Sequence, residues 1–492
     1  MKKLNRYLLL LFGSILGPAS FAQTESTLYF MNSLSQVVDV NPAIMPRYKI
    51  SVGLPLISSF GAIYSNNGFS YNDFTTKVNG VMTADLSKWT SSLADKNYVT
   101  MSMQTDLLRV GVRIHPKTYF MFSSTLKGYN RAMIPKGLAT LAVDGTAPLV
   151  GSFSNTAPQE EGILYNETAA GLSFQVNDRL TIGGRLKYIK GLANITTESS
   201  SLVVQVADAY QITATGSADI RTSGIYNLGQ SGYKVGDHFG DYLKNSGWGV
   251  DLGATFQVMD RLTLGASLVD IGYVKWMNNT YQYTLDPAKA KYTFQGVDIN
   301  QLVNNNTSYI NAQGDSIQAK FKMKETPMGA YTTMLPAKMY LSGKFDINDN
   351  LSVGALFFSE SFRGRYASGL TASLNKNFGK VLSTSVSYTV SNRSYNNLGL
   401  GISLNVSPFQ FYIVGDNLLR APVSLVASQN LNSYINSSQL LTIRTGLNIV
   451  FGWDKGLVKV KGVEDDSHNP RKNSGNKKVT HTIGRPTRKR TR

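Results

Sequence analysis

The chain has 492 residues, 16% of them charged, and a formal net charge of +18. It contains no cysteine, which excludes disulfide bonds, thiolate metal sites, a cysteine nucleophile and a lipid-modified N-terminal cysteine. Much of the charge lies at the two ends. Residues 454–492 hold 12 Lys and Arg against 4 Asp and Glu, and Lys2, Lys3 and Arg6 add to the excess. This distribution does not indicate a compact nucleic-acid-binding domain.

The N-terminus has the three parts of a secretory signal peptide. Basic residues precede a short apolar run, Leu8–Leu16, and small residues at 20 and 22 suit signal peptidase. We expect cleavage before Gln23, which would remove residues 1–22. The alternative is an uncleaved anchor helix, but a membrane span needs roughly 20 apolar residues and this run is shorter. The sequence therefore predicts an exported protein without a helical anchor.

Alternation of apolar and polar residues dominates the chain between residues 48 and 453. Leu382, Thr384, Val386, Tyr388 and Val390, for example, alternate with serines and one threonine. A β-strand follows this period of two when one of its faces meets an apolar medium and the other a wetter one. A soluble β-sandwich would alternate as well, so the lengths of the connections have to decide between the two classes.

The connections alternate between short turns and long polar stretches. Short turns are predicted at 115–117, 177–179, 259–261, 348–350, 377–381 and 407–408. Longer connections are predicted at 67–97, 132–162, 193–247, 277–334 and 419–438, with two shorter ones at 361–367 and 393–396. Transmembrane barrels have short periplasmic turns and long extracellular loops, and sandwiches rarely sort their loops in this way. We predict an all-β fold, a transmembrane antiparallel barrel of about 14 strands in the outer membrane.

The last predicted strand has the pattern of an outer-membrane assembly signal. A polar residue, a glycine, an apolar residue and an aromatic recur at that signal's spacing from Arg444 onward, and we assign the signal to Gly446, Ile449, Phe451 and Trp453. The last three side chains are expected to face lipid, with the aromatic rings at the interface. The barrel assembly machinery is the partner expected during insertion.

The sequence contains no constellation typical of an active site. The four histidines do not share a metal-ligand spacing. Ser124 and Lys127 fit a bare SxxK pattern, but that pattern needs a helix to bring the two side chains together. The segment is predicted to be a strand, which places them on opposite faces. Glu160 and Glu161 lie in a polar loop, where solvation is the simpler interpretation. Residues 346–350 resemble part of a calcium loop but lack its glycine and downstream glutamate, so we interpret them as a turn. We expect no catalytic residue, no metal and no cofactor.

A barrel of this strand number has a lumen too wide for its own wall side chains to fill. Water, a ligand or an inserted segment must occupy it, and residues 23–47 are the candidate plug because they are polar and interrupted by proline. Arg185 and Lys187 are predicted to point inward beside the lipid-facing Leu186. They either line an anion path or pair with acids across the lumen, which is the commoner arrangement.

The region after Trp453 is predicted to be a separate tail. Almost no apolar residues follow Glu464, and such a composition cannot form a packed core. The topology places this basic segment in the periplasm, where peptidoglycan, anionic lipids or an acidic protein could bind it. A solvated tail with no dedicated partner is the alternative, and nucleic acid is not expected in that compartment.

Several motifs resemble an uncharacterised family of Bacteroidetes outer-membrane barrels. They are the segment from Leu28 through Asn41-Pro42-Ala43, the residues Gly53-Leu-Pro and 66–73, and Tyr412–Asn417. That family is similar to the PorV and PorP/SprF barrels of type IX secretion and gliding, and more distantly to FadL-type transporters. The resemblance covers the mature chain up to Trp453. It implies a luminal plug around Asn41, Pro42 and Ala43.

Two functions follow from these observations. The first is a non-enzymatic barrel that passes hydrophobic or amphipathic small molecules through a plugged lumen. The second is a scaffold barrel that binds a surface or periplasmic protein through its long outer loops or its tail. Outer-membrane lipid is a neighbour of the protein under either hypothesis, and the sequence does not separate them.

Overall fold

The computed structural model describes residues 25–66, 71–79, 81–151, 153–207, 211–226, 240, 244–294, 307–391, 394–418 and 440–453. The predicted signal peptide and the predicted basic tail lie outside these residues. Within the described part of the chain, no helix is long and apolar enough to cross a membrane.

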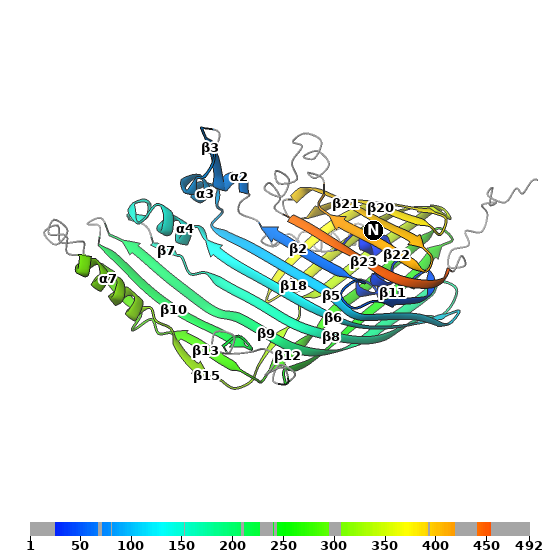
Figure 1. The fold of residues 1–492 in the computed structure, drawn as a ribbon, viewed down its shortest axis with the longest axis horizontal. Helices are drawn as coiled ribbons and strands as arrows, with labels where there is room; N and C mark the ends of the chain where they lie inside the picture. Colours follow the sequence, from blue (N-terminus) through cyan, green and yellow to red (C-terminus); the bar gives the residue numbers. More distant parts are fainter. Residues whose placement is uncertain are drawn as a thin grey trace, which may run out of the picture.

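Fourteen strands of the described residues form one closed antiparallel barrel (Figure 1). Each pairs with its neighbours in the ring, and the last strand closes the ring by pairing with the first, which consists of two pieces. The predicted fold class and strand number are confirmed. The wall strands are β1 (Tyr48–Gly53) with β2 (Phe60–Asn66), β5 (Lys96–His115), β6 (Thr118–Pro135), β8 (Gln159–Gln175), β9 (Leu180–Val206), β11 (Ser246–Met259), β12 (Leu262–Trp276), β17 (Ala337–Asn348), β18 (Leu351–Phe362), β19 (Arg365–Phe378), β20 (Leu382–Ser391), β21 (Ser394–Val406), β22 (Phe409–Asp416) and β23 (Leu440–Trp453).

The alternation of side chains explains why these segments form the wall. On β20, Ser385 and Ser387 are each 1% exposed, whereas Val386 and Tyr388 are 42% and 43% exposed on the outer face. Successive side chains of a strand point to opposite faces, so the apolar set forms the outer surface and the polar set faces inward. Because the ring is closed, the backbone groups of the wall bond to neighbouring strands, as a lipid environment requires.

The six predicted short turns each join consecutive wall strands. The predicted boundaries of the long loops need correction, because regular structure continues into them. Strand β9 runs to Val206 inside the expected loop 193–247, and it pairs there with a further strand. The sequence prediction followed apolar alternation, which ends where the wall leaves the membrane, whereas the backbone hydrogen bonds continue without it.

The elements at this long-loop end are short apart from β10 and α7. They are α2 (Tyr71–Phe74), β3 (Thr75–Val78), β4 (Val81–Ala84), α3 (Leu86–Ser92), α4 (Lys136–Val143), η3 (Ala147–Leu149), β7 (Phe153–Asn155), β10 (Ile212–Ser223), β13 (Thr280–Leu285), β14 (Lys291–Phe294), α7 (Thr307–Lys320), β15 (Lys324–Pro327) and β16 (Tyr331–Met334). Figure 1 shows that β9, β10 and β13 project well past β20–β23, so one side of the barrel continues as an open sheet. We call β10, β13, β14 and β15, together with residues 194–206 of β9, the outer sheet.

The first wall strand is interrupted between β1 and β2. Residues 54–59 depart from strand geometry but keep backbone hydrogen bonds to β5 and β23. Leu56 adopts a φ of +63°, and Leu56 and Ile57 are 62% and 56% exposed. Both pieces still pair with β5 on one side and β23 on the other. The interruption turns the Ser58 carbonyl inward, where it accepts hydrogen bonds from Gln36 Nε2 at 3.1 Å and Tyr412 Oη at 2.9 Å.

Candidate functional site in the barrel lumen

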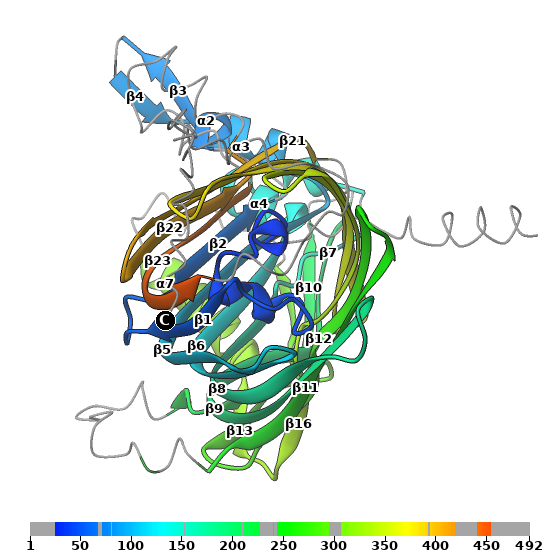
Figure 2. The same cartoon turned by 90° about the vertical axis from the view of Figure 1, so that its right-hand side faces the viewer.

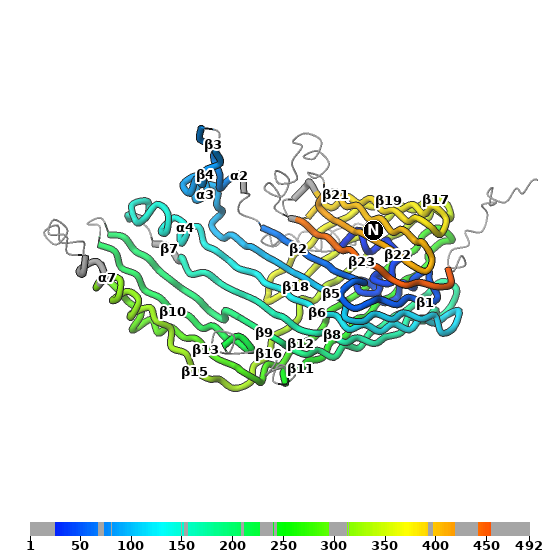
Figure 3. Tube along the Cα trace, viewed as in Figure 1, coloured from blue at the N-terminus to red at the C-terminus, as the bar shows by residue number. Residues whose placement is uncertain are grey.

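Residues 25–47, here called the luminal segment, lie inside the barrel (Figures 2 and 3). The segment contains two short 3₁₀-helices, η1 (Leu28–Phe30) and η2 (Ser35–Asp39). A 3₁₀-helix has three residues per turn, so side chains three positions apart share a face. The sequence meets this spacing with apolar residues that are 0–3% exposed: Leu28, Met31, Leu34, Val37 and Val40.

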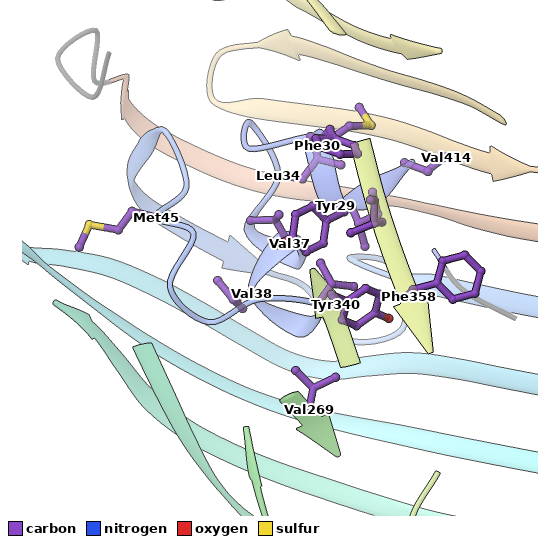
Figure 4. Packing of buried hydrophobic residues seen from close by; sticks show 14 of the residues in the cluster. Tyr29, Phe30, Leu34, Val37, Val38, Met45, Val269, Tyr340, Phe358 and Val414 are labelled. Atoms are coloured by element: carbon purple, nitrogen blue, oxygen red, sulfur yellow. The ribbon is translucent and has the colours of Figure 1, made fainter. Parts of the chain in front are cut away.

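The apolar face of the luminal segment packs against large side chains of the wall (Figure 4). The ring centroid of Tyr29 lies 5.7 Å from that of Tyr340, on β17. The same buried cluster contains wall residues from five further strands: Tyr119, Met121, Val269, Leu356, Phe358, Ala367, Tyr412 and Val414. This contact joins strands that lie apart in the barrel, so the luminal segment forms the core of the membrane-spanning region.

Asn41, Pro42 and Ala43 form a tight turn against the wall. The Asn41 side chain accepts a hydrogen bond from the Ala43 amide at 2.9 Å and donates one to Tyr29 Oη at 3.0 Å. Glycines of the wall make room for this turn, because a Cβ on Gly183 would lie 2.1 Å from the Pro42 carbonyl oxygen. A Cβ on Gly253 would lie 2.2 Å from the Asn41 amide oxygen.

A carboxylate of the luminal segment lies among three arginines from three wall strands. Asp39 Oδ1 accepts from Arg185 Nη1 at 2.7 Å, and Asp39 Oδ2 accepts from Arg109 Nη2 at 2.8 Å and Arg444 Nη2 at 2.7 Å. The three arginines are 1–3% exposed and come from β9, β5 and β23. Arg444 Nη1 also donates to Glu25 Oε2 at 2.7 Å. We call Arg109, Arg185 and Arg444 the arginine triad.

The predicted inward residues Arg185 and Lys187 both lie in the lumen and form ion pairs with carboxylates. Lys187 Nζ is 2.8 Å from Asp251, 2.5 Å from Asp270 and 3.3 Å from Glu167. Its side chain is fully buried. Lys127 Nζ lies 2.9 Å from Glu167 and 3.3 Å from Asp270, so the pairs join into one network across β6, β8, β9, β11 and β12. Ser124 of the bare SxxK pattern instead contacts Asn166.

The residues assigned to the assembly signal lie along β23. A Cβ on Gly446 would lie 2.1 Å from the Ser58 carbonyl oxygen, so this glycine makes room for the interruption of the first wall strand. Phe451 is 47% exposed. The Trp453 ring lies 5.1 Å from the Tyr48 ring, and the Arg47 guanidinium lies 5.4 Å from its centroid. Ile449 pairs with Val52 and Phe409 of the flanking strands.

The outer face of the wall carries an apolar groove of about 630 Å³. The strand register builds it from two adjacent rows of side chains. One row contains Ile443, Ala62, Met103, Gly128, Leu164 and Ala193, and the next contains Leu441, Tyr64, Met101, Asn130, Gly162 and Ile195. Small residues alternate with long ones in the first row, and Gly162 interrupts the second, so the long side chains form the sides and the small ones the floor. Asn130 donates a hydrogen bond to Glu160, just beyond the second row.

A second cavity, of about 200 Å³, opens between the luminal segment and the turns of the wall. Tyr29 and Ile44 line it on one side, and Arg179, Lys344 and Asp346 on the other. It lies at the short-turn end of the lumen, beyond the buried cluster.

The strand pattern identified Arg185 and Lys187 as inward side chains, and the family resemblance implied a plug around Asn41, Pro42 and Ala43. Neither pointed to the luminal contacts of Asp39, Arg109 and Arg444. A usable signal was present for Arg444, which is buried and is the one charged residue of β23. Arg109 shares β5 with Lys96, Asp106 and Arg113, so its charge alone did not single it out. Asp39 gave no such signal, because nothing in its neighbourhood in the sequence marks it as the partner of three distant arginines.

A family model described as "Family of unknown function (DUF5723)" matches residues 42–416. No curated protein matches the chain. Among solved structures, the Ralstonia pickettii toluene transporter TbuX matches with a TM-score of 0.40 and 10% identity, covering 89% of this chain and 96% of that one. A Pseudomonas aeruginosa FadL homologue matches with a TM-score of 0.38 and 11% identity, covering 84% and 93%. These are distant similarities and assign no ligand to this chain.

Proposed function

Because the chain belongs to the DUF5723 family, whose description assigns no activity, we propose a function from the chain's own lumen and wall. The protein is a non-enzymatic outer-membrane channel that the luminal segment closes and that passes hydrophobic or amphipathic small molecules. The observation that carries this proposal is that the luminal segment fills the barrel through non-covalent contacts alone.

These contacts allow the luminal segment to be displaced while the wall stays intact. The wall has its own closed hydrogen-bond ladder from β1 to β23, and the luminal segment contributes no strand to it. At its C-terminal end the segment continues directly into the wall, where Arg47 precedes β1. A local rearrangement of about 20 residues would therefore open the lumen without breaking the barrel, as expected of low-stability elements that move in function.

The apolar groove favours hydrophobic molecules as the passengers. Its volume of about 630 Å³ lies in the range of small-molecule sites, roughly 300–1,000 Å³. It lies on the wall strands that flank the interruption at residues 54–59, and polar residues such as Glu160 follow at its outer end. A molecule with an apolar body and a polar end fits this arrangement.

A single added methyl group tests whether the luminal segment closes the barrel. Gly183→Ala would place a Cβ 2.1 Å from the Pro42 carbonyl oxygen and push the Asn41–Ala43 turn off the wall. Gly184→Ala is the matched control, because its Cβ would meet nothing closer than 3.6 Å. We expect Gly183→Ala to increase leakage of a small polar dye from liposomes severalfold, and Gly184→Ala to leave it unchanged.

Resistance of the unheated barrel to denaturing electrophoresis confirms that each variant has inserted. A chain lacking residues 25–46 should leak more than Gly183→Ala does. If folded barrels of both variants leak no more than the unmodified protein, the luminal segment does not close the channel and the proposal fails.

The outer sheet supports a second candidate function, a scaffold for a protein at the cell surface. Strand β9 pairs with β11 only up to Lys190 and with β10 from Asn194, so the sheet extends beyond the wall. Native mass spectrometry of the gently purified barrel separates the candidates. A bound small molecule without a companion protein favours the channel, whereas a stoichiometric protein cross-linked to β10 or β13 favours the scaffold.

A further inference from the structure

The arginine triad depends on the luminal segment for its anionic partners to different degrees. Arg109 and Arg185 each have a second carboxylate on the wall, Asp106 at 2.6 Å and Asp251 at 2.5 Å. Arg444 differs, since both of its ion-pair partners among the described residues, Glu25 and Asp39, belong to the luminal segment. Displacing that segment would leave Arg444, which is 1% exposed, without a carboxylate.

The charges of the whole network show the same dependence. Among the described residues, the wall contributes six cations to the connected ion pairs, Arg109, Lys127, Arg185, Lys187, Lys338 and Arg444. It contributes four carboxylates, Asp106, Glu167, Asp251 and Asp270. The wall's share is therefore +2, and the two carboxylates of the luminal segment, Glu25 and Asp39, balance it.

Once the luminal segment moves, the arginine triad keeps an excess positive charge that faces the lumen, and an anion can take the place of these carboxylates. Guanidinium groups bind carboxylates and phosphates through paired N–H donors. The three guanidinium groups of the arginine triad already donate to one carboxylate, that of Asp39. The closed site has no room for a second anion. The cavity beside Arg109 and Arg185 measures about 10 Å³, about the space of a single water.

We propose that the arginine triad is a binding site for an oxyanion, a carboxylate, phosphate or sulfate carried by the passing molecule, and that Asp39 occupies this site in the closed barrel. The incoming oxyanion competes with Asp39 for the three guanidinium groups. Its binding keeps the lumen neutral when the luminal segment moves. The inference rests on the proposed closing role of that segment and adds the chemical class of the passenger's polar end.

Calorimetric titration of the full-length protein in an uncharged detergent tests this site, with hexyl phosphate and inorganic phosphate as probes. Asp39→Asn removes the competing charge at nearly constant shape. We expect it to bind hexyl phosphate at least about tenfold more tightly than the unmodified protein, which corresponds to about 1.4 kcal/mol. Adding Arg444→Gln to Asp39→Asn should abolish the gain. Asp346→Asn, which removes a carboxylate paired with Lys344 outside the network, is the matched control and should show no gain.

The two probes distinguish the source of the oxyanion. Tighter binding of hexyl phosphate than of inorganic phosphate assigns the site to an amphipathic molecule, and equal binding assigns it to a free anion. If Asp39→Asn does not resist denaturing electrophoresis, Glu25→Gln replaces it, because it removes the other carboxylate of Arg444 and should give a smaller gain.

Two results overturn the proposal: no gain in a folded Asp39→Asn barrel, or a gain that persists without Arg444. The closing role of the luminal segment is judged separately by the leakage of Gly183→Ala. Unchanged leakage together with the expected gain would therefore reject the channel and keep the site.

Discussion

At the scale of single residues, the lumen is dominated by buried charges that satisfy one another. Lys187 shows this most clearly, because it is fully buried and its Nζ lies within 3.3 Å of three carboxylates on three strands. Removing one member of a buried ion pair is costly because the remaining charges stay buried without compensation.

Lys187→Met should therefore destabilise the barrel by about 3–5 kcal/mol. The free energy of unfolding, measured by urea titration in lipid vesicles, checks this. Lys344→Met is the control, because it breaks one partly exposed ion pair with Asp346 and should cost about 1 kcal/mol or less. Equal losses of unfolding free energy in the two variants would show that the luminal network stabilises the barrel no more than the Lys344–Asp346 pair does.

At the scale of elements, the strand register decides where small residues gather. Gly128 and Gly162 lie on neighbouring strands in adjacent rows of the groove, each beside long apolar side chains. A shift of one residue in either strand would turn that strand's groove residues to the lumen, since the side-chain period is two. The groove is therefore a consequence of the pairing of β2, β5, β6, β8, β9 and β23 and not of one segment.

Filling the groove tests its part in uptake. Gly128→Leu adds a side chain between Met103 and Leu164, which lie 3.3 Å and 3.4 Å from the position of its Cβ. We expect uptake of a hydrophobic fluorescent dye by cells that produce the variant to fall severalfold. Gly343→Leu also adds a leucine to a wall glycine, but on β17, away from the groove, and should leave uptake unchanged. Unchanged uptake in both variants would place the groove outside the route.

At the scale of the whole molecule, the barrel has two different ends. The short-turn end carries the 200 Å³ cavity beside the luminal segment, and the other end carries the outer sheet. Outer-membrane barrels have their short turns in the periplasm, so the outer sheet is expected at the cell surface.

The absence of cysteine makes this orientation directly testable. Lys289→Cys lies in the exposed turn between β13 and β14, and Asp349→Cys in the exposed turn between β17 and β18. A membrane-impermeant maleimide should label Lys289→Cys on intact cells and Asp349→Cys only after permeabilisation. Labelling of Asp349→Cys on intact cells would show that the short turns, and not the outer sheet, lie at the cell surface.

Much of the wall could be predicted because its cause is local. The alternation around Val386 and Tyr388, and the turn residues near 349 and 350, are properties of a few neighbouring residues. The site was less predictable. Arg185 and Lys187 were recognisable as inward side chains by their position in a strand, but their partners Asp251 and Asp270 come from other strands.

The sequence by itself determined the closed barrel of fourteen strands and its six short turns, because a period of two and turn residues act over short distances. Only the tertiary structure decided the convergence of three arginines on Asp39, the groove and the extent of the outer sheet. The arginine cluster and the groove join residues from strands far apart in the chain, and the outer sheet pairs backbone segments that lack the apolar alternation. Their contacts depend on the register around the ring and on the path of the luminal segment, which local sequence does not encode.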